Sequence, residues 1–235
     1  MKKNSFLFLL LFLVGQISAQ NNATTSEYSN ELPEETRLAI VKSALQKLKN
    51  KSTTLVVRLP SNHKKMTELE RLAKSKSLDP QKAKRMQEVL VTTRAMTPAF
   101  NVRLMTSFYE NYDFSEILFM HDTASISLKN GATSGIFLNK RIQADPNIKL
   151  KTKDYLVLHI DYDGFPEAMN INDFDILDMQ FKKLPRPFPQ DARTGVVLNL
   201  GLLFNKDAGM KQFKVMNKMT EKFNKKLNKA YDKYL

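Results

Sequence analysis

Hydrophobic positions recur at helical spacing in three parts of the chain. From 33 to 51, leucine and valine fall on one face of an amphipathic helix, with glutamates in its first turn and lysines at its end. A second helical region runs from 62 to 112, and we expect Pro98 to interrupt it. From 210 to 235, phenylalanine, methionine and leucine line one face of a long helix that carries many lysines.

Apolar and β-branched runs between these helices predict the strands. The first run, 53–60, is stopped by a proline and reads as a buried strand. Further strands are predicted at 114–122, 154–164 and 173–184, the last two in close succession. The segment 194–209 is apolar enough for a buried helix or a strand, so its pattern leaves both open.

This order of elements predicts an α/β fold. A strand, helices, a second strand, a cluster of strands and a long closing helix imply a mixed sheet covered by helices. A thioredoxin-like and a Rossmann-like arrangement both fit this order of elements, and the sequence pattern does not distinguish between them. Residues 20–32 are polar and read as a flexible linker, so 33–235 is predicted to form a single α/β domain.

The first residues have the architecture of a secretory signal peptide. Lys2 and Lys3 form a basic start, 6–14 is an unbroken apolar run, and small residues precede Gln20. The run is shorter than the ~20 residues that span a bilayer. We therefore expect 1–19 to be removed, which leaves no transmembrane segment and places the protein in the periplasm or outside the cell.

Composition narrows the chemistry further. The chain has no cysteine, which excludes thiol nucleophiles, cysteine-ligated zinc and thiol redox chemistry. The formal net charge is +13, which favours anionic partners. We expect the partner to be a protein of the cell envelope or an anionic ligand. Nucleic acid is an unlikely partner because the basic residues lack the motifs of known nucleic-acid modules.

All three histidines lie at or near the ends of predicted strands, and aspartates stand beside them. In open α/β sheets, ligands bind beyond the carboxyl ends of parallel strands. The candidate acid–base residues are His63, His121, Asp122, His159 and Asp161. The candidate metal ligands are His121, His159, Asp161 and Asp163. Polar residues also mark strand ends simply because turns begin there, and that alternative stays open.

Other motifs argue against a bound cofactor. The sequence DYDG resembles the start of a calcium loop, but Asn170 stands where the closing glutamate is needed, so a turn at Asp163-Gly164 is the better interpretation. Phosphate-binding glycine loops, the G-x-S-x-G elbow and H-E-x-x-H are missing from the sequence. We therefore expect no cofactor.

Two segments, FSEILFMHD and DFDILDMQFKKLPRPFP, resemble parts of small exported proteins of unassigned function from Bacteroidetes-type bacteria. The resemblance covers most of the mature chain and rests on aromatic-rich strand segments. It implies export and one α/β domain, but it implies no activity and no site residues.

The leading functional hypothesis is an exported, non-enzymatic α/β domain that binds a partner in the cell envelope. The alternative is a metal-dependent or acid–base hydrolase that uses the histidines and aspartates at the strand ends. A third hypothesis is that the protein attaches to anionic surfaces through the helix 210–235. The apolar stripe of that helix argues against this, because the core of the domain needs it.

Overall fold

A four-stranded mixed sheet organises the structure. The computed structural model describes residues 32–165, 168–189 and 208–235. The strands are β1 (Thr54–Leu59), β2 (Ile117–His121), β3 (Tyr155–Phe165) and β4 (Ala168–Leu177). Their order in the sheet is β2-β1-β3-β4, with β1 parallel to both β2 and β3, and β4 antiparallel to β3. This order begins like the doubly wound 2-1-3-4-5 arrangement, with its fourth strand reversed.

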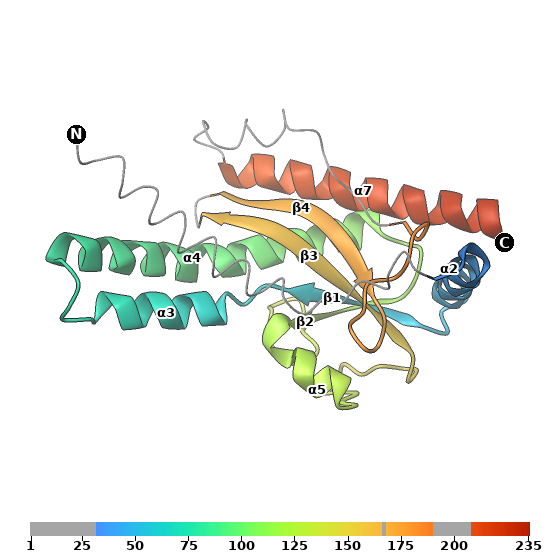
Figure 1. The fold of residues 1–235 in the computed structure, drawn as a ribbon, viewed down its shortest axis with the longest axis horizontal. Helices are drawn as coiled ribbons and strands as arrows, with labels where there is room; N and C mark the ends of the chain where they lie inside the picture. Colours follow the sequence, from blue (N-terminus) through green and yellow to red (C-terminus); the bar gives the residue numbers. More distant parts are fainter. Residues whose placement is uncertain (1–31, 166–167, 190–207) are drawn as a thin grey trace.

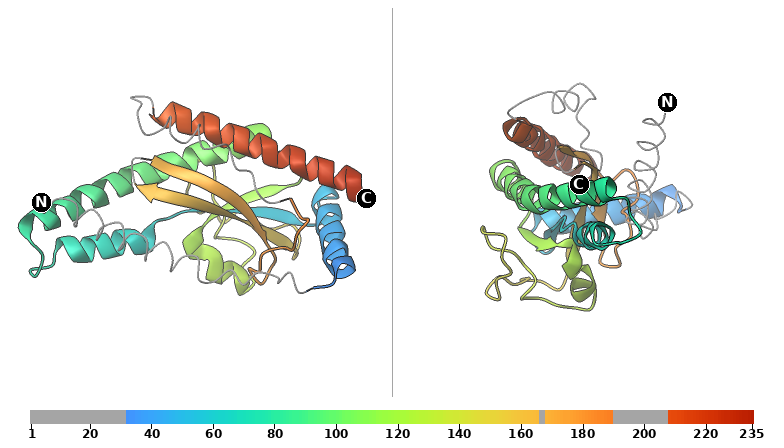
Figure 2. Two further views of the ribbon diagram at one scale, coloured as in Figure 1. Left: turned by 45° about the horizontal axis from the view of Figure 1, so that its top comes forward. Right: turned by 90° about the vertical axis from the view of Figure 1, so that its left-hand side faces the viewer.

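Helices cover both faces of this sheet, which confirms the predicted α/β class. They are α2 (Glu34–Lys49), α3 (His63–Ala73), α4 (Pro80–Asn111), α5 (Ser125–Lys129) and α7 (Ala208–Tyr234). α4 and α7 run along one face, with α2 at one end of it, while α5 lies on the opposite side (Figures 1 and 2). The predicted long C-terminal helix is therefore present as α7. None of the described helices has both the length and the apolar character needed to cross a membrane.

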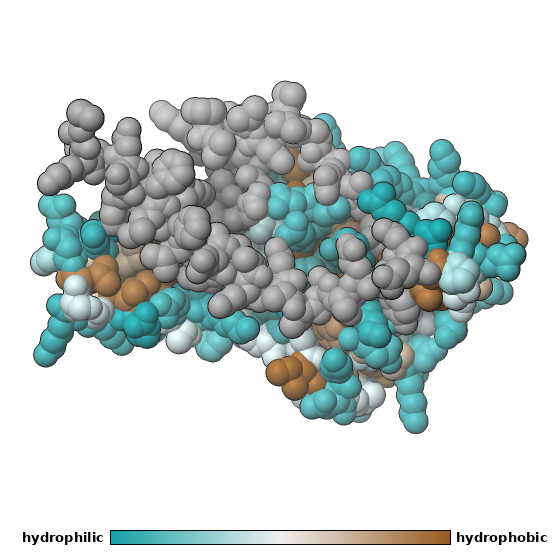
Figure 3. Space-filling model, viewed as in Figure 1, coloured by the Kyte–Doolittle hydropathy of each residue, from teal (hydrophilic) through white to brown (hydrophobic). Residues whose placement is uncertain are grey.

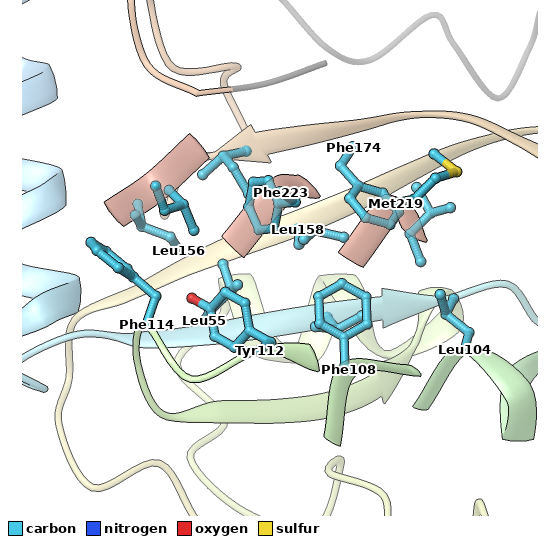
Figure 4. Packing of buried hydrophobic residues seen from close by; sticks show 14 of the residues in the cluster. Leu55, Leu104, Phe108, Tyr112, Phe114, Leu156, Leu158, Phe174, Met219 and Phe223 are labelled. Carbon is cyan, nitrogen blue, oxygen red and sulfur yellow. The ribbon is translucent and has the colours of Figure 1, made fainter. Parts of the chain in front are cut away.

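The main hydrophobic core fills the space between the sheet and α2, α4 and α7 (Figure 4). Alternate residues of β1 and β3 point into it, because successive side chains of a strand face opposite sides. Phe174 of β4 joins the two long helices, with its ring centroid 5.6 Å from that of Phe108 on α4 and 5.7 Å from that of Phe223 on α7.

A second, smaller cluster covers part of the opposite face of the sheet. Val56 of β1 and Val157 of β3 are buried in it, together with residues of β2, β4 and α5. The next residues on this face, two positions further along each strand, are Arg58 and His159. The apolar cover thus ends where charged side chains begin, at the carboxyl end of β1.

The helix α3 and the first half of α4 form a helical hairpin, residues 63–97, that extends beyond the sheet (Figure 1). We call this hairpin the arm. Asp79 caps α4 by accepting hydrogen bonds from the backbone N–H groups of Gln81 and Lys82, at 2.9 and 3.3 Å. Arg94 of α4 forms an ion pair with Glu70 of α3 at 3.1 Å.

Three local predictions are wrong. The strand predicted at 173–184 is β4 from Ala168 to Leu177, and the chain turns after it, where the N–H of Phe181 donates to the Asp178 carbonyl at 2.9 Å. Pro98 does not interrupt α4, which continues through it. Pro98 is exposed, so water can reach the Arg94 carbonyl that loses its helical hydrogen bond. The chain also does not turn at Asp163-Gly164, because β3 continues to Phe165 and Gly164 pairs with Met169 of β4. The predicted signal peptide, nearly all of the predicted linker and most of 194–209 lie outside the described residues.

Candidate functional site

The carboxyl ends of β1 and β2 lie level with the middle of β3, near His159, at a change in the direction of winding. The connection from β1 to β2 passes through α4 on the main-core face, and the connection from β2 to β3 includes α5 on the other face. Such a topological switch point is where open α/β sheets bind ligands. It lies between β1 and β3, and it is therefore the first place to examine for a site.

A row of polar side chains crosses the sheet at this point. Arg58 of β1 pairs with His159 of β3, and His159 pairs with Asp175 of β4. Asp175 in turn forms an ion pair with Lys183 at 2.6 Å, and both side chains are largely shielded from solvent. We call Arg58, His159, Asp175 and Lys183 the polar row. Its two cations and one carboxylate surround a single imidazole.

Burial and the neighbouring guanidinium keep that imidazole neutral. Desolvation, followed by the positive charge of Arg58, lowers the pKa of His159 to about 4. Asp175 and Asp122 oppose this shift only in part. Burial also lowers the pKa of Arg58, whose buried Nε has no hydrogen-bond partner among the described residues. His159 is therefore uncharged at neutral pH.

The structure does not bring the three histidines together. His121 follows Phe119 on the main-core side of the sheet, whereas His159 lies on the opposite face. The strands β2 and β3 are also separated by β1, which puts their backbones about 10 Å apart, or two strand spacings. His63 is exposed at the start of α3. His121 and His159 therefore cannot share one metal ion.

The aspartates are placed as follows. Asp161 lies on the same face as His159, two residues further along β3, and pairs with Asp173 of β4. Asp122 accepts a hydrogen bond from the backbone N–H of Ser61 at 3.1 Å and is close enough to act on the pKa of Arg58. The side chain of Asp163 lies outside the described part of the chain. Within that part, no group of three histidine, aspartate or glutamate side chains is arranged to hold a metal.

The chemistry of the polar row fits a structural role better than acid–base catalysis. A general base works best when its pKa lies near the operating pH, and a pKa of about 4 makes His159 a weak base at pH 7. Arg58, Asp175 and Lys183 are not among the candidates that the sequence pattern indicated. Arg58 did give a signal, because it is a charged residue within the otherwise apolar run LVVRLP.

A second candidate site is the solvent face of α7. The apolar stripe of this helix is buried in the main core, as predicted. Lysines recur every three or four residues on the other side, and all six are exposed: Lys214, Lys218, Lys222, Lys225, Lys229 and Lys233. We call these six the lysine face. It is about 28 Å long at the helical rise of about 1.5 Å per residue, and the surface over the C-terminal half of α7 is largely hydrophilic (Figure 3).

Within this surface, Lys225 forms an ion pair with Glu221 at 2.6 Å. Such exposed pairs contribute little to stability, so we infer no structural need for this density of lysine. The geometry thus offers two sites of different kinds, a largely buried polar row and a positively charged helix surface. Comparisons with protein-family models, curated proteins and solved structures gave no match.

Proposed function

We propose that this protein is an exported, non-enzymatic binding domain whose α7 helix holds an anionic partner. The observation that supports the proposal is the lysine face. Its six ammonium groups extend along one side of a helix whose opposite side is fixed in the hydrophobic core. A row of fixed positive charges concentrates and orients anions along the same line.

The shape of this surface favours a linear polyanion, namely an acidic polysaccharide. The charges follow one helix axis for about 28 Å, so an extended chain can contact several of them in sequence. A helix that inserts into a membrane needs apolar residues on its outer side. In α7, Val215, Met219 and Phe223 are instead buried against the sheet. Contact with lipids would therefore be electrostatic only.

Export is the second part of the proposal, and it rests on residues 1–19. The basic start, the short apolar run and the small residues before Gln20 suit secretion and cleavage. Mass spectrometry of the protein isolated from the producing cell tests this directly. A mature form that begins at or near Gln20 is expected. An intact mass that includes 1–19 would contradict cleavage.

Heparin, a sulfated linear polysaccharide, is a suitable probe for the lysine face. Affinity is measured by calorimetry at several salt concentrations for the wild type and for K214Q/K218Q/K229Q. The matched control, K129Q/K149Q/K153Q, removes the same charge from exposed lysines on α5 and its following loops. If about 0.7–0.9 counterions are released per contact, the α7 variant should reduce the slope of log K against log[salt] by about 2 to 3.

The control variant should keep most of the wild-type slope, since only its net charge has changed. Equal loss in both variants would mean that net charge alone drives binding, and would overturn the role of α7. Two further ligands identify the class of anion. Tighter binding to acidic lipid vesicles or to duplex DNA than to heparin would replace the polysaccharide with that ligand.

A further inference from the structure

The solvent side of α4 carries apolar side chains that remain about half exposed, although the ring of Tyr109 also packs on Phe119 of β2, with 5.2 Å between ring centroids. Val91, Val102 and Tyr109 are 55%, 47% and 49% exposed. Ala95 and Pro98 are exposed on the same side of the helix. At the helical period these five residues form one stripe about 27 Å long. Scattered apolar residues on a surface are normal, but a continuous stripe along a helix is typical of an interaction surface.

The spacing of this stripe is symmetric. The exposed Lys84 lies on the same side of α4 and extends the stripe to six members, which are Lys84, Val91, Ala95, Pro98, Val102 and Tyr109. The separations along the chain are 7, 4, 3, 4 and 7 residues, counted from the sequence. They read the same in both directions about a midpoint between residues 96 and 97. In an antiparallel pair of identical helices, each member therefore meets its mirror position on the other copy.

We propose that α4 of one molecule pairs with α4 of a second copy in antiparallel orientation, related by a twofold axis. In such an interface the same patch is used twice, so residue i contacts residue j and j contacts i. Val91 then contacts Val102 of the other copy. Ala95 meets Pro98, and Lys84 meets Tyr109.

The side chains suit these contacts. Ala95 and Pro98 are small enough at the centre to let the two helices approach closely. The valine pairs bury apolar surface on either side of them. At the ends, an ammonium group meets an aromatic ring, which is a favourable cation–π contact. Tyr109 already accepts this kind of contact, because the Nζ of Lys140 lies 5.8 Å from its ring centroid.

Dimerisation through α4 and polyanion binding to α7 should depend on salt in opposite directions. The full chain carries a net charge of +13, and it stays strongly positive without Lys2 and Lys3, so two copies repel each other at low ionic strength. Salt screens that repulsion and leaves the apolar contact largely unchanged. Dimerisation should therefore strengthen as salt rises, whereas binding of a polyanion to α7 should weaken.

The cysteine-free sequence allows a sharp test of the register. V91C and V102C are prepared separately and oxidised alone or as an equal mixture. In the proposed pair, residue 91 is opposite residue 102 of the other copy, and two copies of residue 91 are about 16 Å apart, or 11 helical residues. The mixture should give a covalent dimer of one copy of each, and neither variant alone should do so efficiently. A control variant, S77C at the exposed tip of the arm, should not cross-link with either.

Sedimentation measures the same association without cysteine. The wild type should become dimeric with rising concentration, and more readily at 0.5 M than at about 0.05 M salt, given Debye lengths of roughly 4 and 14 Å. A95E should be monomeric with an unchanged far-UV spectrum and unchanged heparin affinity per chain. Cross-linking of V91C alone as efficiently as the mixture would mean a parallel or non-specific contact. That result, or a wild type that stays monomeric at all concentrations, would overturn the proposal.

Discussion

Ser107 on α4 and Thr220 on α7 are both completely buried, and their hydroxyl oxygens lie 2.8 Å apart. This hydrogen bond joins the two long helices across the main core. Replacing one of the two residues leaves the hydroxyl group of the other buried without this hydrogen bond. We expect Ser107→Ala to lower the free energy of unfolding by about 1–3 kcal/mol, measured by urea denaturation.

The double variant S107A/T220V provides the matched comparison. It removes both hydroxyl groups and keeps the shape of Thr220, so no polar group of the pair is left unsatisfied. We expect it to be more stable than the Ser107→Ala single variant, because removing both partners of a buried bond is often nearly neutral. Additive losses in the double-mutant cycle would show that the two hydroxyls do not interact.

The pKa of His159 predicts a specific loss of stability in acid. Its pKa falls from 6.5 in the unfolded chain to about 4 in the fold, so the unfolded state binds the proton more tightly. This group therefore leaves stability unaffected above pH 6.5. It destabilises the fold progressively as the pH falls to about 4, by roughly 3 kcal/mol in total.

The variant His159→Gln isolates this effect from the titration of the carboxylates. Denaturation is measured for both proteins at several values from pH 7 to pH 4. The difference in unfolding free energy should shift in favour of the variant as the pH falls. Parallel pH profiles would mean that His159 keeps an ordinary pKa.

Phe223 is the point where α7 contacts the sheet and α4 together. Its side chain is fully buried, stacks on Tyr112 with 6.1 Å between ring centroids, and meets Phe174 edge-on. Phe223→Ala should cost about 3–5 kcal/mol in unfolding free energy, whereas Phe223→Leu should cost clearly less. Calorimetric melting of the two variants tests the order. An equal loss in both would show that the ring contacts, which both variants remove, account for the whole effect and that the buried volume of residue 223 does not matter.

Asn62 connects the start of the arm to the rest of the fold. Its Nδ2 donates to Thr97 Oγ1 at 2.9 Å, and its Oδ1 accepts from the Tyr162 hydroxyl at 3.3 Å. Its backbone is left-handed, with φ of 54°. Asn62→Gly and Asn62→Ala lose the same hydrogen bonds, but only alanine is strained at this φ. We expect the alanine variant to be less stable than the glycine variant by about 1 kcal/mol in denaturant titrations.

The local hydrophobic pattern predicted most elements of this fold, because the residues that form the apolar stripes and runs are the ones buried in the core. The helical stripe from residue 210 onward is buried in α7, and the apolar run 53–60 is the central strand β1. At Asp163-Gly164 the prediction failed because a local signal was outweighed by long-range pairing. Asp163-Gly164 has the composition of a turn, yet pairing with β4 keeps β3 extended there.

The candidate sites could be predicted only in part. His121 ends β2 and His63 follows β1 closely, but the prediction is wrong for His159, which lies in the middle of β3. Spacing along the chain also says nothing about which face of a sheet a residue occupies. His121 and His159 lie on opposite faces of the sheet, and their strands are separated by β1. The partners of His159 in the polar row come from β1, from β4 and from the segment after β4, so only the assembled sheet reveals them.

The position of β1 also sets when the sheet can assemble. It is synthesised first among the strands, yet its neighbours are supplied by residues 117–121 on one side and by the start of β3 on the other. At least 57 residues therefore separate β1 from its first partner, counting from Leu59 to Ile117. Pairing over such sequence distances carries a loop-closure cost before any contact is gained. A ribosome-bound chain that ends inside α4 should hold its helices but no sheet, so the protein should complete its fold only after nearly all of it has been made.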